Sequence, residues 1–191
     1  IRNSLYSNGN VTVLKISNFT VWLKIKQSNN TDIFLAGVYI PPLDSSSTIS
    51  SFQDNNAFHL IQEEISHFNK RGTVAICGDF NARTGKLQDF LLTPGNDIID
   101  MPGSLPITPE FPNNFPRHNR YSDDSKCNRY GKELIELCKS SGMRIMNGYF
   151  MENKSTGSFT CYTPCGKSLV DYLICDAKLY ENLQTFNLEP L

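Results

Sequence analysis

Residues 33–40, with the sequence IFLAGVYI, form a nearly continuous apolar run that stops at Pro41 and Pro42. Runs of this kind are typical of strands that are buried on both faces of a sheet, and proline ends them because it cannot donate to the strand ladder. Apolar residues at three- and four-residue spacing then predict an amphipathic helix over residues 52–70. A second buried strand follows at residues 73–77. The order of strand, helix and strand predicts a parallel pair within a mixed sheet, and therefore an α/β fold.

The rest of the chain is predicted to contain further strands and helices. Apolar and polar residues largely alternate over residues 11–16 and 19–26, which indicates two strands joined by a short turn. A helix is expected over residues 129–140, and Gly142 is placed to end it. The remaining predicted elements are a short helix at residues 88–92 and strands at residues 143–146, 157–162 and 168–175. No repeat or linker divides the chain, so we expect one domain.

The charge, the lack of long apolar runs and the cysteine content indicate in which kind of compartment the protein works. With 18 basic and 19 acidic residues the chain has no global field that attracts nucleic acid or an anionic membrane, so any polyanion site must be local. No apolar run is long enough to span a membrane, and the first residues lack the apolar core of a secretory signal. The six cysteines have no framework spacing, which favours a reducing compartment. We therefore expect an intracellular protein, nuclear or cytoplasmic, with no membrane partner.

The run Gly78-Asp79-Phe80-Asn81-Ala82 lies where an apolar strand passes into a loop, which is the usual location of catalytic side chains in α/β sheets. The Asp79 carboxylate there can act as a general base on water or hold a divalent cation, and the Asn81 amide can donate to a phosphate oxygen. An aspartate that follows a glycine at a strand end is also a common turn or capping residue. The run alone leaves both interpretations open.

A second acidic residue, Asp171, interrupts the apolar sequence SLVDYLI at residues 168–174. An unpaired buried charge is costly, so a partner is expected. One interpretation is that Asp171 orients a histidine that acts as a base, although none of the three histidines of the chain is an obvious candidate. The alternative is a purely structural pairing with a backbone or arginine donor.

Residues 113–132 carry a local excess of positive charge, with five basic residues against two aspartates. Aromatic residues are interleaved with these cations, which suits a groove that contacts phosphates and stacks on bases. The alternative is a solvated surface loop with internal ion pairs. From this segment we select four candidate nucleic-acid contacts, namely Arg117, Arg120, Arg129 and Tyr121.

Five motifs in order resemble the endonuclease/exonuclease/phosphatase superfamily, and in particular its branch of LINE-type retrotransposon endonucleases. They are GVYIPP at residues 37–42, GDFNARTG at 78–85, NG at 147–148, GSFT at 157–160 and SLVDY at 168–172. The resemblance implies a four-layer α/β sandwich with two mixed β-sheets. It also implies hydrolysis of DNA phosphodiester bonds by an in-line water, with Mg²⁺ or Mn²⁺ as the cofactor.

The resemblance also implies roles for four residues. Asp79 would activate the water and contribute to the metal site, and Asn81 would bind the scissile phosphate. Tyr39 would contact the phosphate or the leaving group, and Asp171 would orient the catalytic histidine. Taken without the family, Tyr39 is an ordinary aromatic residue at the end of a strand.

Two features of the family pattern are absent from this sequence. Family members present a metal-binding glutamate upstream of the region that matches this chain, and they end with a Ser-Asp-His segment. We therefore expect residues 1–191 to be a partial domain, truncated at both ends and inactive as an isolated chain. The alternatives are a phosphatase or phosphodiesterase of the same superfamily, or a non-catalytic remnant that binds nucleic acid. The sequence does not predict the oligomeric state.

Overall fold

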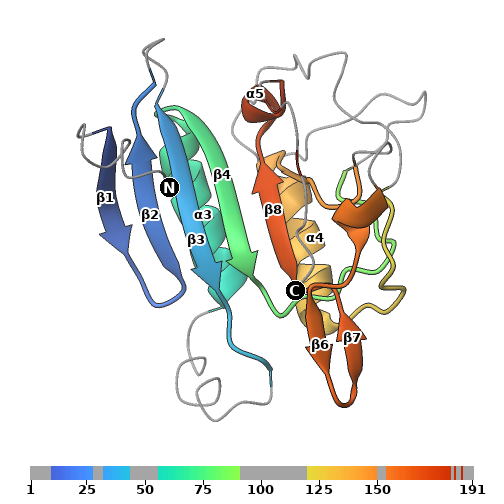
Figure 1. The fold of residues 1–191 in the computed structure, drawn as a ribbon. Coiled ribbons are helices and arrows are strands. Elements are labelled where there is room, and N and C mark those ends of the chain that lie inside the picture. Colours follow the sequence, from blue (N-terminus) through green and yellow to red (C-terminus); the bar gives the residue numbers. More distant parts are fainter. Residues whose placement is uncertain are drawn as a thin grey trace.

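The computed structural model describes residues 10–27, 32–43, 56–90, 120–149, 154–181, 183 and 186. These residues form a six-stranded mixed sheet, two long helices and a separate two-stranded ribbon (Figure 1). The strands of the large sheet, in spatial order, are β1 (Val11–Ile16), β2 (Thr20–Ile25), β3 (Ile33–Tyr39), β4 (Thr73–Asp79), β8 (Asp171–Cys175) and β5 (Arg144–Ile145). The other elements are α3 (Ala57–Asn69), α4 (Arg129–Ser141), the 3-10 helix η1 (Lys154–Gly157), the ribbon of β6 (Cys161–Thr163) and β7 (Gly166–Ser168), and α5 (Ala177–Tyr180).

The order of the strands confirms the predicted α/β class. β1, β2 and β3 are antiparallel neighbours, while β3 and β4 are parallel and are separated in sequence by α3. β8 pairs antiparallel with β4 on one side and with β5 on the other. The structure therefore contains the predicted mixed sheet with a parallel central pair, and the second sheet among the described residues is the two-stranded ribbon of β6 and β7.

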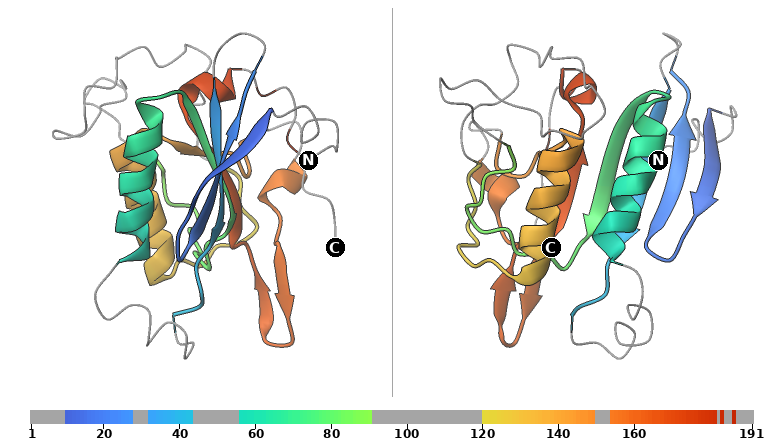
Figure 2. Two further views of the ribbon diagram at one scale, coloured as in Figure 1. Left: turned by 90° about the vertical axis from the view of Figure 1, so that its left-hand side faces the viewer. Right: turned by 180° about the vertical axis from the view of Figure 1, so that it is seen from behind.

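Helices α3 and α4 lie along one side of the large sheet, and the β6–β7 ribbon projects from the other side (Figure 2). Both helices begin at an asparagine: the side chain of Asn56 accepts from the Phe58 N–H, and that of Asn128 accepts from the Gly131 N–H. Gly142 ends α4 in the left-handed conformation, as predicted. The apolar faces of the two helices and of the sheet form one core.

Three predicted elements differ from the structure near the end of the chain. The strand expected at residues 143–146 contains only Arg144 and Ile145. The strand expected at residues 157–162 is replaced by η1 and then by β6, which begins at Cys161. The strand expected at residues 168–175 is divided into β7 and β8, since side-chain oxygens accept the N–H groups of Leu169 and Val170 in place of a neighbouring strand.

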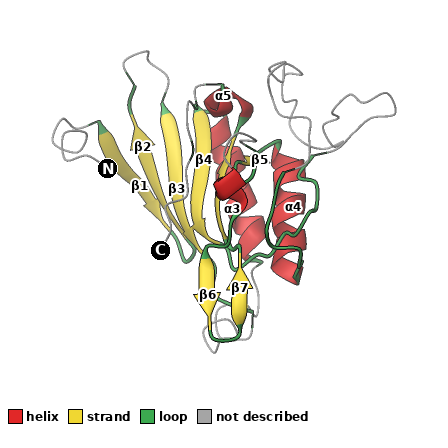
Figure 3. Ribbon diagram, turned by 45° about the vertical axis from the view of Figure 1, so that its right-hand side comes forward, coloured by secondary structure: helices red, strands yellow, loops and turns green. Residues whose placement is uncertain are grey.

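The short helix expected at residues 88–92 is wrong for residues 88–90, which are not helical. Here tertiary contacts outweigh the local pattern, because the Asp89 carboxylate accepts from the Ile145 N–H at 2.8 Å and from the Tyr149 hydroxyl at 2.8 Å. Residues 91 and 92 lie outside the described residues. Figure 3 shows the sheet and the helices from a third side.

All six cysteines are free thiols. No helix in the parts of the chain that the structure describes is long and apolar enough to cross a membrane.

A buried glutamate ties the β1–β2 hairpin to α3. The Glu64 carboxylate accepts from the Thr20 hydroxyl and from the Trp22 indole N–H, each at 2.7 Å, and it lies 2.6 Å from the Lys15 ammonium. Burial alone would raise the pKa of Glu64, but these hydrogen bonds outweigh it and hold the pKa below its usual value. The ionised form is therefore the one that stabilises the hairpin.

Glu64→Ala is expected to lower the free energy of unfolding by about 1–3 kcal/mol near neutral pH, because the fully buried indole of Trp22 loses its acceptor. The folded-state pKa is depressed, so this stabilisation is present above the unfolded pKa of about 4.3 and is lost as the pH falls through the folded pKa. Urea unfolding across this pH range measures both effects. Glu63→Ala, at an exposed position of the same helix, should change stability by less than about 0.5 kcal/mol, and an equal loss in both variants would contradict the prediction.

Candidate functional site

Three of the four predicted catalytic residues lie in one row across adjacent strands. β3 and β4 end at the same end of the sheet at which β8 begins (Figure 1). In the register of these strands, Tyr39 lies opposite Asp79, and Asp79 lies opposite Asp171. Side chains that are directly opposite on neighbouring strands share one face of a sheet and lie within reach of each other. The sheet therefore brings together residues that are up to 132 positions apart in the sequence.

Asp79 is the last residue of β4, where its carboxylate is half-buried. Burial raises the pKa of Asp79, the negative charge of Asp171 raises it further, and a hydrogen bond of 2.8 Å from the Asn81 backbone N–H lowers it in part. The net direction is upward. A carboxyl group with a raised pKa accepts a proton more readily than an ordinary aspartate, as a general base requires.

Asn81 follows in a left-handed backbone conformation, with φ of 47°. Its side-chain Nδ2 donates to the Ile40 carbonyl at 2.8 Å, and its own carbonyl accepts from the Nδ2 of Asn128 at 2.9 Å. Asn128 is also the residue that caps α4, where its Oδ1 accepts from the N–H groups of Gly131 and Arg83. The loop that carries Asn81 is thus fixed to β3 on one side and to the beginning of α4 on the other.

Tyr172 makes a second connection between the same loop and β8. Its buried hydroxyl lies 2.9 Å from the carbonyls of Ala82 and Leu169, and 3.2 Å from the Thr84 hydroxyl. Burial raises the pKa of Tyr172, so this group stays neutral and acts as a hydrogen-bonding anchor. The tyrosine of the SLVDY motif therefore holds the GDFNARTG loop in place, whereas its neighbour Asp171 lies in the row with Asp79.

Asp171 is half-buried at the first position of β8, and this corrects the prediction of one strand over residues 168–175 with Asp171 in its interior. Among the described residues, none donates a hydrogen bond to its carboxylate. His59 and His67 lie on α3, where they contact Glu63 and Phe68 respectively, and His118 is outside the described residues. A histidine partner for Asp171 therefore stays a prediction.

Tyr39 has an exposed fraction of 57%, so its ring faces solvent at the end of the row. An exposed tyrosine opposite Asp79, where β3 and β4 end, can contact a bound molecule without any rearrangement of the core. Its contact with a phosphate or a leaving group stays a prediction.

The residues of the row fit a divalent cation in part. Within the described parts of the chain, no group of three or more histidine, cysteine, aspartate or glutamate side chains is placed to hold a metal ion. Asp79 and Asp171 supply two carboxylates on adjacent strands, and carboxylate oxygens are the ligands that Mg²⁺ prefers. The negative charges of Asp79 and Asp171 repel each other, and a cation near Asp79 would relieve this repulsion.

The four candidate nucleic-acid contacts have different environments. Arg120 has an exposed fraction of only 7% and donates to the Thr84 hydroxyl at 2.9 Å, so its side chain is directed into the protein rather than toward a ligand on the surface. Arg129 is exposed and pairs with Glu133, and the Tyr121 hydroxyl donates to Asp123. Arg117 lies outside the described residues. Contact of Arg129 and Tyr121 with nucleic acid stays a prediction.

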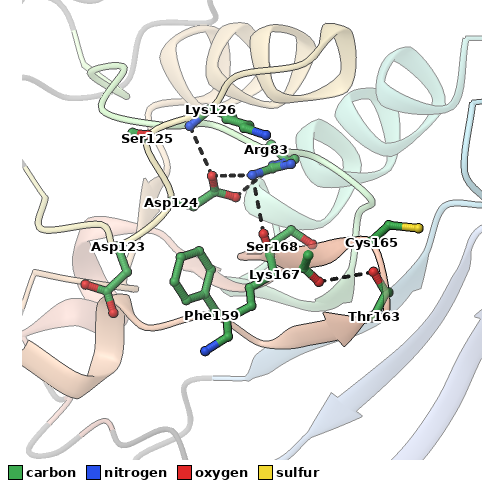
Figure 4. Close-up of a pocket in the computed structure, with 11 residues that line it drawn as sticks. Arg83, Asp123, Asp124, Ser125, Lys126, Phe159, Thr163, Cys165, Lys167 and Ser168 are labelled. Atoms are coloured by element: carbon green, nitrogen blue, oxygen red, sulfur yellow. Dashed lines mark hydrogen bonds and ion pairs between the residues drawn. The ribbon is translucent and has the colours of Figure 1, made fainter.

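A pocket of about 480 Å³ lies between the β6–β7 ribbon and the turn at residues 123–126 (Figure 4). Its wall contains an ion pair, in which Arg83 donates to both oxygens of Asp124 at 2.8 and 2.6 Å. Burial alone would raise the pKa of Asp124, but the hydrogen bonds from Arg83 and from backbone N–H groups outweigh it and hold that pKa below its usual value. The lining residues are Arg83, Asp123, Asp124, Ser125, Lys126, Phe159, Thr163, Cys165, Gly166, Lys167 and Ser168.

Sequence reasoning missed Asn128, Arg83 and Asp124 as residues that hold the site together. Asn128 carries a recognisable signal, because an asparagine directly before a predicted helix is a capping candidate. Arg83 and Asp124 are 41 positions apart, and nothing in the local pattern of either residue indicates that they pair.

No protein-family model and no curated protein matches this sequence. Among solved structures, the chain is similar to the 3′ phosphatase NExo from Neisseria bound to a product DNA hairpin, with a TM-score of 0.46 and 10% identity over 87% of this chain and 58% of that chain. It is also similar to the 3′-5′ exonuclease NExo from Neisseria meningitidis, with a TM-score of 0.48 and 11% identity over 90% of this chain and 60% of that chain. This chain thus spans less than two thirds of the length of these two structures, and the likeness concerns the arrangement of the chain alone.

Proposed function

We propose that this chain carries part of the catalytic centre of a divalent-cation-dependent phosphodiester hydrolase that acts on DNA. The observation that supports the proposal most directly is the row of Tyr39, Asp79 and Asp171 at one end of the sheet. The row consists of two carboxylates and a solvent-exposed tyrosine on adjacent strands, and Asn81 lies on the loop that follows β4.

Each residue of the site has a chemical task in this proposal. A Mg²⁺ or Mn²⁺ ion, when bound, supplies positive charge against the phosphate, and Asp79 is the residue that would hold it. Asp79 also accepts a proton from the attacking water. The Asn81 amide uses one N–H on the Ile40 carbonyl, which leaves its second N–H for a phosphate oxygen. Asp171 orients a histidine, and Tyr39 contacts the phosphate or the leaving group.

A finer proposal is that the enzyme is an endonuclease of the LINE-type retrotransposon branch. It is supported by the GDFNARTG sequence at residues 78–85 together with SLVDY at residues 168–172. The sequence of the gene on either side of this region tests the proposal, because a retroelement is expected to encode a reverse transcriptase downstream. An unrelated coding region in that place would contradict the retroelement origin while leaving the hydrolase proposal intact.

Nicking of supercoiled plasmid tests the proposed reaction. The protein in its natural length is incubated with Mg²⁺, with Mn²⁺ and with a chelator, and the products are separated on a gel. We expect open-circular DNA with either cation and none with the chelator. Release of phosphate from a 3′-phosphorylated duplex without nicking would favour the phosphatase alternative, and binding of DNA without either product would favour the non-catalytic alternative.

The 191-residue chain alone is expected to show no nicking above the rate measured with the chelator. The reason is that, among the described residues, no group of three or more side chains is placed to hold a metal ion and no histidine lies beside Asp171. General acid/base catalysis accelerates a reaction by roughly 10²- to 10⁴-fold. Loss of the histidine alone therefore brings the rate of nicking close to background. The measurement is the same plasmid assay, and cation-dependent nicking by this chain would show that other residues complete the site.

A further inference from the structure

The backbone of Asp171 is held by two side chains from outside its own strand. The Thr160 Oγ1 accepts from the Asp171 N–H at 3.2 Å and from the Val170 N–H at 3.2 Å. The Asn147 Nδ2 donates to the Asp171 carbonyl at 3.1 Å, and the Oδ1 of the same residue accepts from the Leu173 N–H at 3.0 Å. Both polar groups of the Asp171 backbone are therefore bound to side chains.

These contacts arise where the regular strand ladder stops. β5 pairs with the last two residues of β8, Ile174 and Cys175, so within the described parts of the chain the beginning of β8 has no neighbouring strand on that side. Asn147 lies two residues after the end of β5 and is fully buried, and its side chain binds the start of β8 where β5 does not reach. Thr160 binds the N–H of Val170, which lies between β7 and β8, and the N–H of Asp171, the first residue of β8.

We propose that Thr160 and Asn147 are positioning residues that hold the Asp171 carboxylate beside Asp79, and this inference rests on the proposed function of that row. Asp79 and Asp171 are directly opposite in the register and repel each other. A residue at the first position of a strand is free to move away from such a charge unless its backbone is fixed. Thr160 and Asn147 fix it by binding its N–H and its carbonyl, both on the edge of β8 that faces away from β4.

The test compares Thr160→Val, which removes the acceptor and keeps the shape, with Thr160→Ser, which keeps the acceptor. Asn147→Asp tests the other contact, because it loses the N–H that donates to Asp171 and keeps an oxygen for the Leu173 N–H. Thr163→Val is the matched control, since the Thr163 hydroxyl donates to the Gly166 carbonyl within the ribbon. All variants are made in the protein in its natural length and are measured for DNA cleavage, for amide hydrogen exchange and for urea unfolding.

We expect Thr160→Val and Asn147→Asp to lower kcat roughly 10- to 100-fold, the usual effect of removing a group that orients a catalytic ligand, with KM for DNA within about twofold. Thr160→Ser should restore kcat to within about threefold, and Thr163→Val should leave it unchanged. In the absence of cation and DNA, the Asp171 amide should exchange roughly fivefold faster or more in Thr160→Val than in the unmodified protein.

The outcomes separate this inference from the function on which it rests. If the unmodified protein has no turnover, or if Asp79→Asn has full turnover, the proposed function fails and this inference fails with it. If Asp79→Asn is inactive while Thr160→Val keeps kcat, this inference alone is wrong. Equal losses of kcat in Thr160→Val and Thr160→Ser, or an unchanged exchange rate at Asp171, would likewise overturn it.

Discussion

Asp79→Asn is expected to lower cation-dependent cleavage of DNA by at least about 100-fold in any form of the protein that cleaves DNA. The substitution keeps the size of the side chain and an oxygen that can accept the Asn81 N–H, so the loop should keep its shape. It removes the negative charge that would hold the cation and the group that would accept a proton. The initial rate of plasmid nicking at saturating Mg²⁺ measures the effect.

Asp32→Asn provides the matched control for this variant. Asp32 precedes β3, at the end of that strand away from Tyr39, and its carboxylate pairs with Lys24 at 2.6 Å. Loss of this pair removes a negative charge of the same kind at a distance from the row, so cleavage should stay within about twofold. Near-normal cleavage by Asp79→Asn, or an equal loss in the two variants, would show that the Asp79 carboxylate does not take part in the reaction.

The long elements of the fold could be predicted from the sequence because their burial follows a simple period. β3 and β4 are apolar runs, and α3 places Ile61, Ile65 and Phe68 on one face that packs against the sheet. The structure confirms the parallel pair and the antiparallel hairpin before it. In these segments the local pattern and the tertiary contacts favour the same conformation, and a pattern is informative where both agree.

The elements near Asp171 could not be predicted in the same way. The apolar run over residues 168–175 has the composition of one strand, but it is divided because Asp124 accepts the Leu169 N–H and Thr160 accepts the N–H groups of Val170 and Asp171. These acceptors come from other segments of the chain, and their positions depend on the complete fold. A residue pattern contains no information about such partners until the neighbouring segments are placed.

In the candidate site, too, some residues could be predicted from the sequence and others could not. Asp79, Asn81 and Asp171 were identified because their types are unusual in apolar surroundings or because their motifs are specific, and the register then placed Asp79 beside Asp171. Asn128 and Asn147 were not identified as supports, since an asparagine beside a helix or a strand has many possible structural roles. Their function is visible only in the distances from their amide groups to the loop and to β8.

Gly78→Ala is expected to lower the free energy of unfolding by at least about 2 kcal/mol and to reduce cleavage with it. Gly78 has a φ of 144°, which L side chains rarely adopt, and a Cβ atom there would lie 2.0 Å from the Val38 carbonyl oxygen. That oxygen belongs to the neighbouring strand β3, so the clash cannot be relieved by a change of rotamer. Relief requires β3 and β4 to separate at the position next to Tyr39 and Asp79.

Gly37→Ala is the control, because Gly37 lies one position before Val38 on β3 and a Cβ atom there meets nothing within 4 Å. Its backbone is extended and its surface is exposed, so alanine should change stability by less than about 1 kcal/mol and can even stabilise the strand. Urea unfolding of the two variants gives the comparison, provided that the m-values agree. A midpoint for Gly78→Ala equal to that of Gly37→Ala would mean that β3 and β4 are not held as closely as the register indicates, and the row of Tyr39, Asp79 and Asp171 would lose its structural basis.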